Sequence, residues 1–317
     1  MNLLKFAAID IGTNAVRLLF ANVIEDEGET YFKKSSLIRM PIRLGEDVFE
    51  FDKIKKKRAH NLIRMLNAFK LLMKANDVVQ YRACATSAMR EAKNGQKLIE
   101  LIKRKTDMDI ELISGSEEAE IISQTQIKDL LKKNPNLLFV DVGGGSTEIT
   151  FFKKGKVLKS HSFKIGTIRI LKNKVDKQEI KELDIWLSEI KKDYKNIKII
   201  GSGGNINKLY KFSQKHEGKG LLYKELKSVY EKILSYSYED RIKVLGFNPD
   251  RADVIIPATE IFITIMEKAG INKIFVPKIG LADGIIILEY KKFKETLEEK
   301  EVVSNKLCKV DFPQSII

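Results

Sequence analysis

The chain has 317 residues, which is enough for two domains with separate hydrophobic cores. Its hydrophobic content of 44% is ordinary for a globular protein, and its net charge of +14 predicts a surface field that attracts polyanions, unless the widely spread lysines reflect only a general lysine richness. Cys84 and Cys308 lie far apart and the three histidines are scattered, which argues against a disulfide framework, a zinc site and a Ser-His-Asp triad.

The first half of the chain predicts three strands within residues 5–39, followed by alternating helices and strands. The predicted helices are 52–75, 96–106 and a third that begins at 114–116 and runs to about Lys132, and the predicted strands between them are 78–84 and 110–113.

The second half repeats this plan. Strands are predicted at 137–142, 147–153, 156–163, 197–200 and 273–276, and helices at 177–195, after 201–204, and at 223–235, 238–245, 251–268 and 281–298. The tail from about Glu299 carries no clear pattern. Strands followed by helices in both halves predict an α/β protein with two lobes, the second with additional helices.

Two segments in register carry the same pattern of an apolar run, an acid, a turn of small residues and a second apolar run. They are 6–20, with Asp10 followed by Ile-Gly-Thr-Asn14, and 137–151, with Asp141 followed by Val-Gly-Gly-Gly145-Ser-Thr-Glu148. A single copy is most simply a hairpin turn. Two copies, one with three adjacent glycines that give up backbone entropy, favour the close approach of a ligand, and a carboxylate beside bare N–H groups suits metal and phosphate.

No membrane span is expected, because the apolar stretch near 254–266 contains Pro257 and Glu260. Asp10 interrupts any signal-peptide core. The sequence therefore predicts a soluble, cytoplasmic protein.

Together with segments 82–94, 113–119 and 200–207, the run Arg251-Ala-Asp-Val-Ile-Ile-Pro257 and the late segment 280–284, these motifs resemble the exopolyphosphatase/guanosine pentaphosphate phosphatase family, within the sugar kinase–Hsp70–actin superfamily. The resemblance covers nearly the whole chain. It implies two ribonuclease H-like, actin-like lobes with a cleft between them. We expect the lobes to divide as 1–125 and 126–317, with the helix near 281–298 packing back on the first lobe.

The resemblance implies Mg²⁺-dependent hydrolysis of a terminal phosphoanhydride, with Glu118 as the base that activates water. A carboxylate in the first turn of a helix, after a strand, is held rigidly enough for that role. The alternative from the residues alone is that Glu117 and Glu118 only complement the helix N-terminus after a Ser cap. We expect Glu117 to be the capping neighbour.

The remaining roles also follow from the resemblance. Asp141, with Asp10 as its counterpart, is expected to hold Mg²⁺, and Glu148 to support the acids or position water, unless it pairs with a surface lysine. Arg90 is expected to clamp a phosphate, unless it is solvated. The phosphate-binding candidates are Thr13, Asn14, Gly143, Gly144, Gly145, Ser146, Gly203 and Gly204.

Two positions depart from the family pattern: Asn205, where Ser or Thr is common, and Ala258, where Gly is common. These departures concern the distal, base- or chain-binding end of the cleft. Longer relatives carry a C-terminal helical extension with a His-Asp metal-binding domain; this sequence holds no His-Asp pair, and we expect no such domain in it.

The leading hypothesis is an exopolyphosphatase that releases orthophosphate from the ends of inorganic polyphosphate. The alternatives are a guanosine pentaphosphate (pppGpp) 5′-phosphatase and a non-catalytic sensor of (p)ppGpp or nucleotide; a sugar kinase is disfavoured because no sugar pocket is evident. No stable complex with nucleic acid is expected, and the oligomeric state is left open between a monomer and a homodimer.

Overall fold

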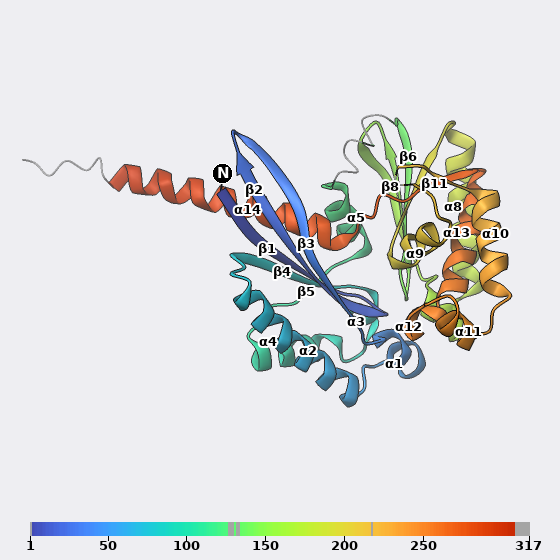
Figure 1. Cartoon of the computed structure of the whole chain (residues 1–317), viewed down its shortest axis with the longest axis horizontal. Coiled ribbons are helices and arrows are strands. Elements are labelled where there is room, and N and C mark those ends of the chain that lie inside the picture. Colours follow the sequence, from blue (N-terminus) through green and yellow to red (C-terminus); the bar gives the residue numbers. More distant parts are fainter. Residues whose placement is uncertain (1, 126–129, 131–133, 217, 308–317) are drawn as a thin grey trace, which may run out of the picture.

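Two β-sheets, one in each half of the chain, organise the fold (Figure 1). The computed structural model describes residues 2–125, 130, 134–216 and 218–307. The first sheet has the order β3-β2-β1-β4-β5 and the second the order β10-β11-β9-β6-β7-β8. The strands are β1 (Asn2–Ile11), β2 (Ala15–Asp26), β3 (Glu29–Pro41), β4 (Gln80–Ala85), β5 (Glu111–Leu112), β6 (Asn136–Val142), β7 (Thr147–Lys153), β8 (Lys156–Phe163), β9 (Lys198–Ser202), β10 (Leu221–Leu222) and β11 (Lys273–Phe275).

The two sheets share one plan. In each, three antiparallel strands connected by short turns are followed by a strand that pairs in parallel with the first, β4 with β1 and β9 with β6. The turns after the first strand of each sheet, 10–14 and 141–145, are here called the Asp-Gly turns. They therefore mark equivalent places in two related lobes. The predicted α/β class with two lobes is confirmed.

The helices of the first lobe are α1 (Leu44–Phe51), α2 (Lys56–Ala75), α3 (Ser87–Glu91), α4 (Gly95–Thr106) and α5 (Gly115–Ser123). The predicted helix 52–75 differs at its start, because Asp52 adopts a left-handed conformation (φ 56°) and its N–H bonds Val48 O. This cap ends α1, and α2 begins four residues later. The predicted extension of the helix after 114–116 reaches only Ser123, and positions 126–129 and 131–133 lie outside the described residues.

The second lobe carries α7 (Thr167–Leu171), α8 (Lys177–Asp193), α9 (Gly204–Phe212), α10 (Tyr223–Leu234), α11 (Tyr238–Lys243), α12 (Pro249–Ala252) and α13 (Ile255–Ala269). Figure 1 shows α8, α10 and α13 together on the outer side of the second sheet. The predicted helix 251–268 is divided into α12 and α13. Within the described part of the chain, no helix is both long and apolar enough to cross a bilayer.

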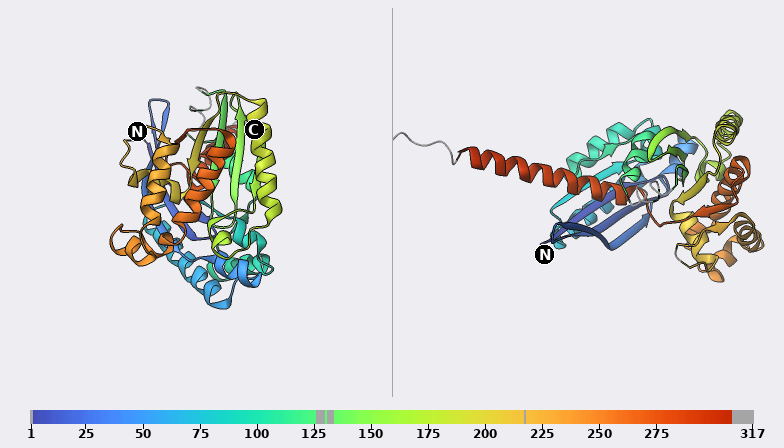
Figure 2. Two further views of the ribbon diagram at one scale, coloured as in Figure 1. Left: turned by 90° about the vertical axis from the view of Figure 1, so that its right-hand side faces the viewer. Right: turned by 90° about the horizontal axis from the view of Figure 1, so that it is seen from above.

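The last helix, α14 (Leu281–Leu307), leaves the second lobe and packs against β1, β2, β4 and α5 of the first (Figures 1 and 2). The ring of Phe6 on β1 meets Tyr290 and Phe293 edge to face, with centroids 5.9 and 5.7 Å apart. The helix continues past the predicted 281–298, and its end projects beyond the body (Figure 2).

A buried apolar cluster joins the two sheets beneath α14. Phe6 and Cys84 of the first sheet, Phe139 and Ile200 of the second, and Ile285 of α14 all belong to it. Burying apolar side chains from both lobes in one cluster fixes how the sheets face each other. The Asp-Gly turn of each lobe then opens toward the other.

Candidate active site

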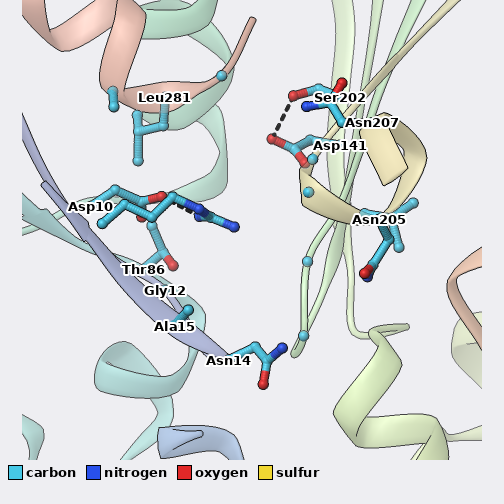
Figure 3. Close-up of a pocket in the computed structure, with 18 of the residues that line it drawn as sticks. Asp10, Gly12, Asn14, Ala15, Thr86, Asp141, Ser202, Asn205, Asn207 and Leu281 are labelled. Carbon is cyan, nitrogen blue, oxygen red and sulfur yellow. Dashed lines mark hydrogen bonds and ion pairs between the residues drawn. The ribbon is translucent and has the colours of Figure 1, made fainter. Parts of the chain in front are cut away.

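A cleft of about 450 Å³ lies between the lobes (Figure 3). Both Asp-Gly turns, the first turn of α5, the start of α9 and the segment entering α14 contribute to it. Of the predicted site residues, those that line the cleft are Asp10, Thr13, Asn14, Glu118, Asp141, Gly143, Gly144, Gly145, Ser146, Glu148, Gly203 and Gly204. Figure 3 shows Asp10 and Asp141 on opposite sides of the space.

The first-lobe acid, Asp10, is buried at the end of β1 and has a partner that the sequence analysis did not single out. Arg17 lies opposite it on β2, and Arg17 Nη1 donates to Asp10 Oδ2 at 2.5 Å. The pairing register places these side chains together although they are seven residues apart. Asp10 is therefore an ion-pair partner as well as a candidate metal ligand.

The second-lobe acid, Asp141, lies opposite Glu148 in the register of β6 and β7. Ser202 Oγ lies 3.1 Å from Asp141 Oδ2 and 2.9 Å from the backbone oxygen of Ile279, so its single proton serves two acceptors. The Ser202 hydroxyl thus connects Asp141 to the segment that leads into α14.

Glu148 is buried and is held by two hydroxyl groups. Ser146 Oγ and Ser162 Oγ donate to its Oε1 at 2.6 and 2.9 Å. Hydroxyl partners, instead of a surface lysine, keep this carboxylate inside the cleft.

The start of α5 separates the roles of its two glutamates. The Ser114 hydroxyl accepts from the N–H of Glu117 at 3.1 Å, and the Glu117 carboxylate accepts from the N–H of Ser114 at 2.7 Å, which completes a capping box. The hydrogen bond from the Ser114 backbone lowers the pKa of Glu117, which is exposed. The expectation that Glu117 is the capping residue is confirmed, and Glu118 alone of the two lines the cleft.

The carboxylates of Glu118 on α5, Asp141 on β6 and Glu148 on β7 are near enough for their charges to affect one another. Desolvation first, and then the charges of Glu148, Asp141 and Asp10, raise the pKa of Glu118 well above its ordinary range. Desolvation and the neighbouring Glu148 raise the pKa of Asp141 to about 7, and desolvation raises the pKa of Glu148. Such a cluster is costly unless protons or a cation neutralise it.

Arg90 lies behind this acidic cluster. It is not among the residues that line the cleft, and its Nη1 donates to the backbone oxygen of Ile113 at 2.7 Å. Its charge favours ionisation of Glu118 and Glu148. In this conformation Arg90 holds the backbone between β5 and α5, and its charge partly offsets the rise in the pKa of Glu118 and Glu148.

The glycine loop Gly143–Ser146 is oriented by the start of α7. The backbone oxygen of Gly143 accepts from Thr167 N at 3.1 Å, and that of Gly144 accepts from Ile168 N at 2.8 Å and from Arg169 N at 3.2 Å. In a trans peptide the N–H points away from the C=O of the same peptide unit. The N–H groups of Gly144 and Gly145 therefore point away from α7.

Glycine is required at positions 144 and 145 for a reason other than the close approach of a ligand that the sequence predicts. A Cβ on Gly144 would lie 2.9 Å from Thr13 Cγ2, and one on Gly145 would lie 2.8 Å from Phe49 Cζ and would collide with Ser87 Oγ. These atoms belong to the first lobe. In this structure the close approach that requires glycine is made by the facing lobe.

The other phosphate-binding candidates lie at the two ends of the cleft. Asn14 Nδ2 donates to the backbone oxygen of Asp250 at 3.1 Å, while the buried Asn14 Oδ1 has no hydrogen-bond partner. Gly203 precedes α9 with φ 103°, and a Cβ there would lie 2.9 Å from Asp141 Oδ1. Only glycine suits both that backbone conformation and the neighbouring carboxylate.

Basic side chains that the sequence analysis did not assign line the rest of the cleft. They are Arg17, Lys34, Arg39, Lys208, Lys211, Arg251 and Lys278. Burial, followed by the nearby charges of Arg39 and Arg17, lowers the pKa of Arg251 to about 10. Arg251 lies in the run 251–257 that contributes to the family resemblance, and Lys208 and Lys211 follow the Gly203-Gly204 turn at helical spacing, so the sequence carries a signal for each of them.

The side chains of the protein would provide only part of the ligands of a metal ion. Among the described residues, no three His, Cys, Asp or Glu side chains are grouped so as to hold a metal ion. Mg²⁺ commonly takes one or two carboxylates and completes its shell with water and substrate phosphate. The oxygen donors of Asp141 and Glu148 suit such a shared site.

Comparison with known proteins identifies the family of the chain. The model of the Ppx/GppA phosphatase family matches residues 23–293. A bifunctional 3-dehydroquinate synthase/phosphatase of Fusobacterium nucleatum is 30% identical, over 89% of this chain and 46% of that protein. A guanosine-5′-triphosphate,3′-diphosphate pyrophosphatase of Aeromonas hydrophila is 22% identical, over 89% of this chain and 58% of that protein. This chain spans about half the length of these two relatives.

A shorter relative and two solved structures match along nearly their whole length. Exopolyphosphatase 2 of Mycobacterium tuberculosis is 24% identical, over 90% of this chain and 99% of that protein. The Ppx/GppA family member of Aquifex aeolicus has a TM-score of 0.72 at 28% identity, over 92% of this chain and 99% of that one. An exopolyphosphatase of Cytophaga hutchinsonii, at 21% identity, has a TM-score of 0.75 over 88% and 96% of the two chains, which shows a shared fold. The predicted two-lobe, actin-like architecture is confirmed.

Proposed function

Because this chain belongs to the Ppx/GppA phosphatase family, we propose that it hydrolyses terminal phosphoanhydride bonds of inorganic polyphosphate and releases orthophosphate. One observation carries the proposal: buried and half-buried carboxylates line the same cleft as a set of arginines and lysines. Crowded cations attract a polyanion, and the acids supply a base for water.

The glycine loop and the basic wall would hold the terminal phosphate. The N–H groups of Gly144 and Gly145 have no hydrogen-bond partner among the described residues and can donate to phosphate oxygens. Arg17 and Arg251 would stabilise the charge that develops on the transferred group. Thr13 and Gly204, which line the same cleft, complete the enclosure.

Glu118 would take the proton of the attacking water. The water oxygen bonds to the terminal phosphorus while the bond from that phosphorus to the bridging oxygen breaks. The products are orthophosphate and a chain one phosphate shorter, and the proton held by Glu118 returns to solvent. Glu148, fixed by Ser146 and Ser162, would orient that water.

Mg²⁺ fits the acidic cluster because charge neutralisation offsets the mutual repulsion of its carboxylates. Asp141 and Glu148 would hold it, and Asp10 would join them once its ion pair with Arg17 is exchanged for a phosphate. When bound, Mg²⁺ supplies charge that polarises the phosphate oxygens.

A guanosine pentaphosphate is the second candidate substrate. The buried Oδ1 atoms of Asn14 and Asn207 lack hydrogen-bond partners, and both residues line the cleft. Sugar hydroxyls and base N–H groups can donate to such oxygens, whereas fully ionised polyphosphate offers no donor. The relative from A. hydrophila carries a name of this substrate class.

The deciding experiment is phosphate release from long polyphosphate, tripolyphosphate and pppGpp, measured side by side with Mg²⁺. We expect release from polyphosphate, with a Glu118→Gln variant as the blank. Release from pppGpp alone would favour the second candidate, and release from none would contradict the proposed hydrolase.

A further inference from the structure

Arg169 connects three parts of the molecule from a buried position. It lies on α7 of the second lobe with 8% of its surface exposed. Its Nε donates to the backbone oxygen of Gly145 at 2.8 Å, and its Nη2 lies 2.7 and 2.6 Å from the two carboxylate oxygens of Glu91 on α3 of the first lobe. The guanidinium also stacks on Phe49, 4.1 Å from the ring centroid.

The contact with Gly145 fixes one peptide plane of the glycine loop. Because the Gly145 C=O points to Arg169, the Ser146 N–H must point the opposite way. The backbone of Thr167 and Ile168 does the same for the two preceding peptides. Arg169 is thus the side-chain member of a set that aims three successive N–H groups away from α7.

The contact with Glu91 makes this arrangement depend on the position of the first lobe. Glu91 Oε1 also accepts from Ser87 Oγ at 2.9 Å, and Ser87 lies directly against Gly145. If the lobes move apart, Arg169 loses its contact with Glu91, and at the same time the loop loses its contact with Ser87. The orientation of the loop and the closure of the lobes are therefore linked through one side chain.

We infer that Arg169 is a positioning residue, which sets the N–H donors of loop Gly143–Ser146 for a phosphate when the lobes are closed. The inference rests on the proposed function, since it assigns a purpose to the phosphate-facing loop. Arginine suits this place because its planar fork serves a carboxylate and a carbonyl at once, whereas lysine presents a single ammonium point.

The first test measures anion binding without turnover. In a Glu118→Gln background, tripolyphosphate is titrated by calorimetry into the parent, Arg169→Lys and Lys172→Met proteins. Losing charge-assisted hydrogen bonds should weaken binding about tenfold to hundredfold in Arg169→Lys. Lys172→Met is the matched control, because Lys172 also forms an ion pair between the lobes, with Glu50 at 2.6 Å, while no hydrogen bond among the described residues joins it to the loop.

The results of this titration distinguish the positioning role of Arg169 from the proposed function. Unchanged binding by Arg169→Lys, or equal weakening in Lys172→Met, would overturn the positioning role. A parent that binds no tripolyphosphate would contradict the proposed function itself, and with it the purpose assigned to the loop.

The second test needs no ligand. The melting temperature of the double variant Arg169→Met/Glu91→Gln should fall by less than the sum of the falls in the two single variants, because each change removes the same Arg169–Glu91 contact. Additive losses would show that the two side chains do not act together and would overturn the link to lobe closure. In active protein with Mg²⁺, Arg169→Lys should raise KM more than it lowers kcat, a pattern that a fall in folded fraction does not produce.

Discussion

Two adjacent glutamates at the start of α5 have opposite environments. Glu117 is exposed and caps the helix, whereas Glu118 faces the cleft among other acids. We expect Glu118→Gln to lower kcat by about 10²–10⁴ while polyphosphate binding persists, because only the general base is lost. The measurement is kcat together with calorimetric binding.

Glu117→Gln is the control for this change. It weakens the capping box, so we expect a loss of about 1 kcal/mol or less in the free energy of unfolding and little change in kcat. If Glu117→Gln lost activity and Glu118→Gln kept it, the assignment of the base would be wrong.

Asp141 links stability to pH. Its pKa is raised from an ordinary 3.8 to about 7 in the folded protein, so between these pH values the folded state binds more protons than the unfolded state. Without divalent cations, the free energy of unfolding should therefore decrease as pH rises from about 4 to about 7. Asp141→Asn should flatten this decline and raise the melting temperature at pH 8, measured by thermal denaturation in EDTA.

The same variant tests the metal proposal. Because Asn carries no charge, Asp141→Asn should increase the Mg²⁺ concentration needed for half-maximal activity. Full activity of the parent protein in EDTA would contradict both the metal role and the proposed reaction class.

Several site residues could be predicted from the chain because they sit in local motifs. Asp141 and the glycines of its turn lie in the strand–turn–strand pattern that occurs twice in the chain, whereas Glu118 could be assigned only through the family resemblance. Arg17 could not be assigned this way, because its pairing with Asp10 depends on strand register. Arg169 belongs to no such motif, and its two partners lie 24 and 78 residues away.

At the scale of elements, α5 brings the first-lobe base to the second-lobe acids through a close approach at Gly115. A Cβ there would lie 2.7 Å from Ser162 Cβ on β8. Gly115→Ala should shift α5 by a few tenths of an ångström and lower kcat about tenfold, since a displacement of about 1 Å can cost 10². Steady-state kinetics measures the effect.

Ser116→Ala is the matched control, because this exposed residue lies in the same first turn and its hydroxyl bonds that of Ser114. Equal kcat in Gly115→Ala and Ser116→Ala would show that the approach of α5 is not critical for activity.

Strands and long helices could be predicted because apolar periodicity is strong over many residues. The short helices α1 and α7 are not predicted from the sequence, because their eight and five residues are too few for a clear apolar periodicity. The sequence identifies the glycine loop but predicts a bound ligand, instead of the facing lobe, as the reason for its glycines. The neighbours Thr13 and Ser87 become visible only when the two lobes are placed together.

At the scale of the whole molecule, the positive charge distinguishes the two candidate substrates. A long polyphosphate that contacts many lysines and arginines would release many counterions, so its KM should rise steeply with salt, as for nucleic-acid backbones. pppGpp makes fewer ionic contacts and should show a shallow slope. The measurement is KM for both substrates across a salt series at fixed Mg²⁺.

With an excess of fourteen positive charges, we expect the steep slope and a preference for the longer chain. A flat slope for polyphosphate combined with a lower KM for pppGpp would favour the nucleotide phosphatase.

The return of α14 to the first lobe also has a mechanical consequence. Between β11 and α14 the chain returns to the first lobe, so an opening of the lobes about this connection would move the Ser202 hydroxyl very little, because it donates to the backbone oxygen of Ile279 there. The ion pairs Arg39–Asp250 and Arg43–Asp253 join β3 and the start of α1 to the region of α12, away from the beginning of α14 in Figure 1. Because these two ion pairs lie farthest from the connection, an opening of the lobes would separate their partners the most. Together they would therefore oppose the rotation most effectively, although each pair alone contributes little free energy.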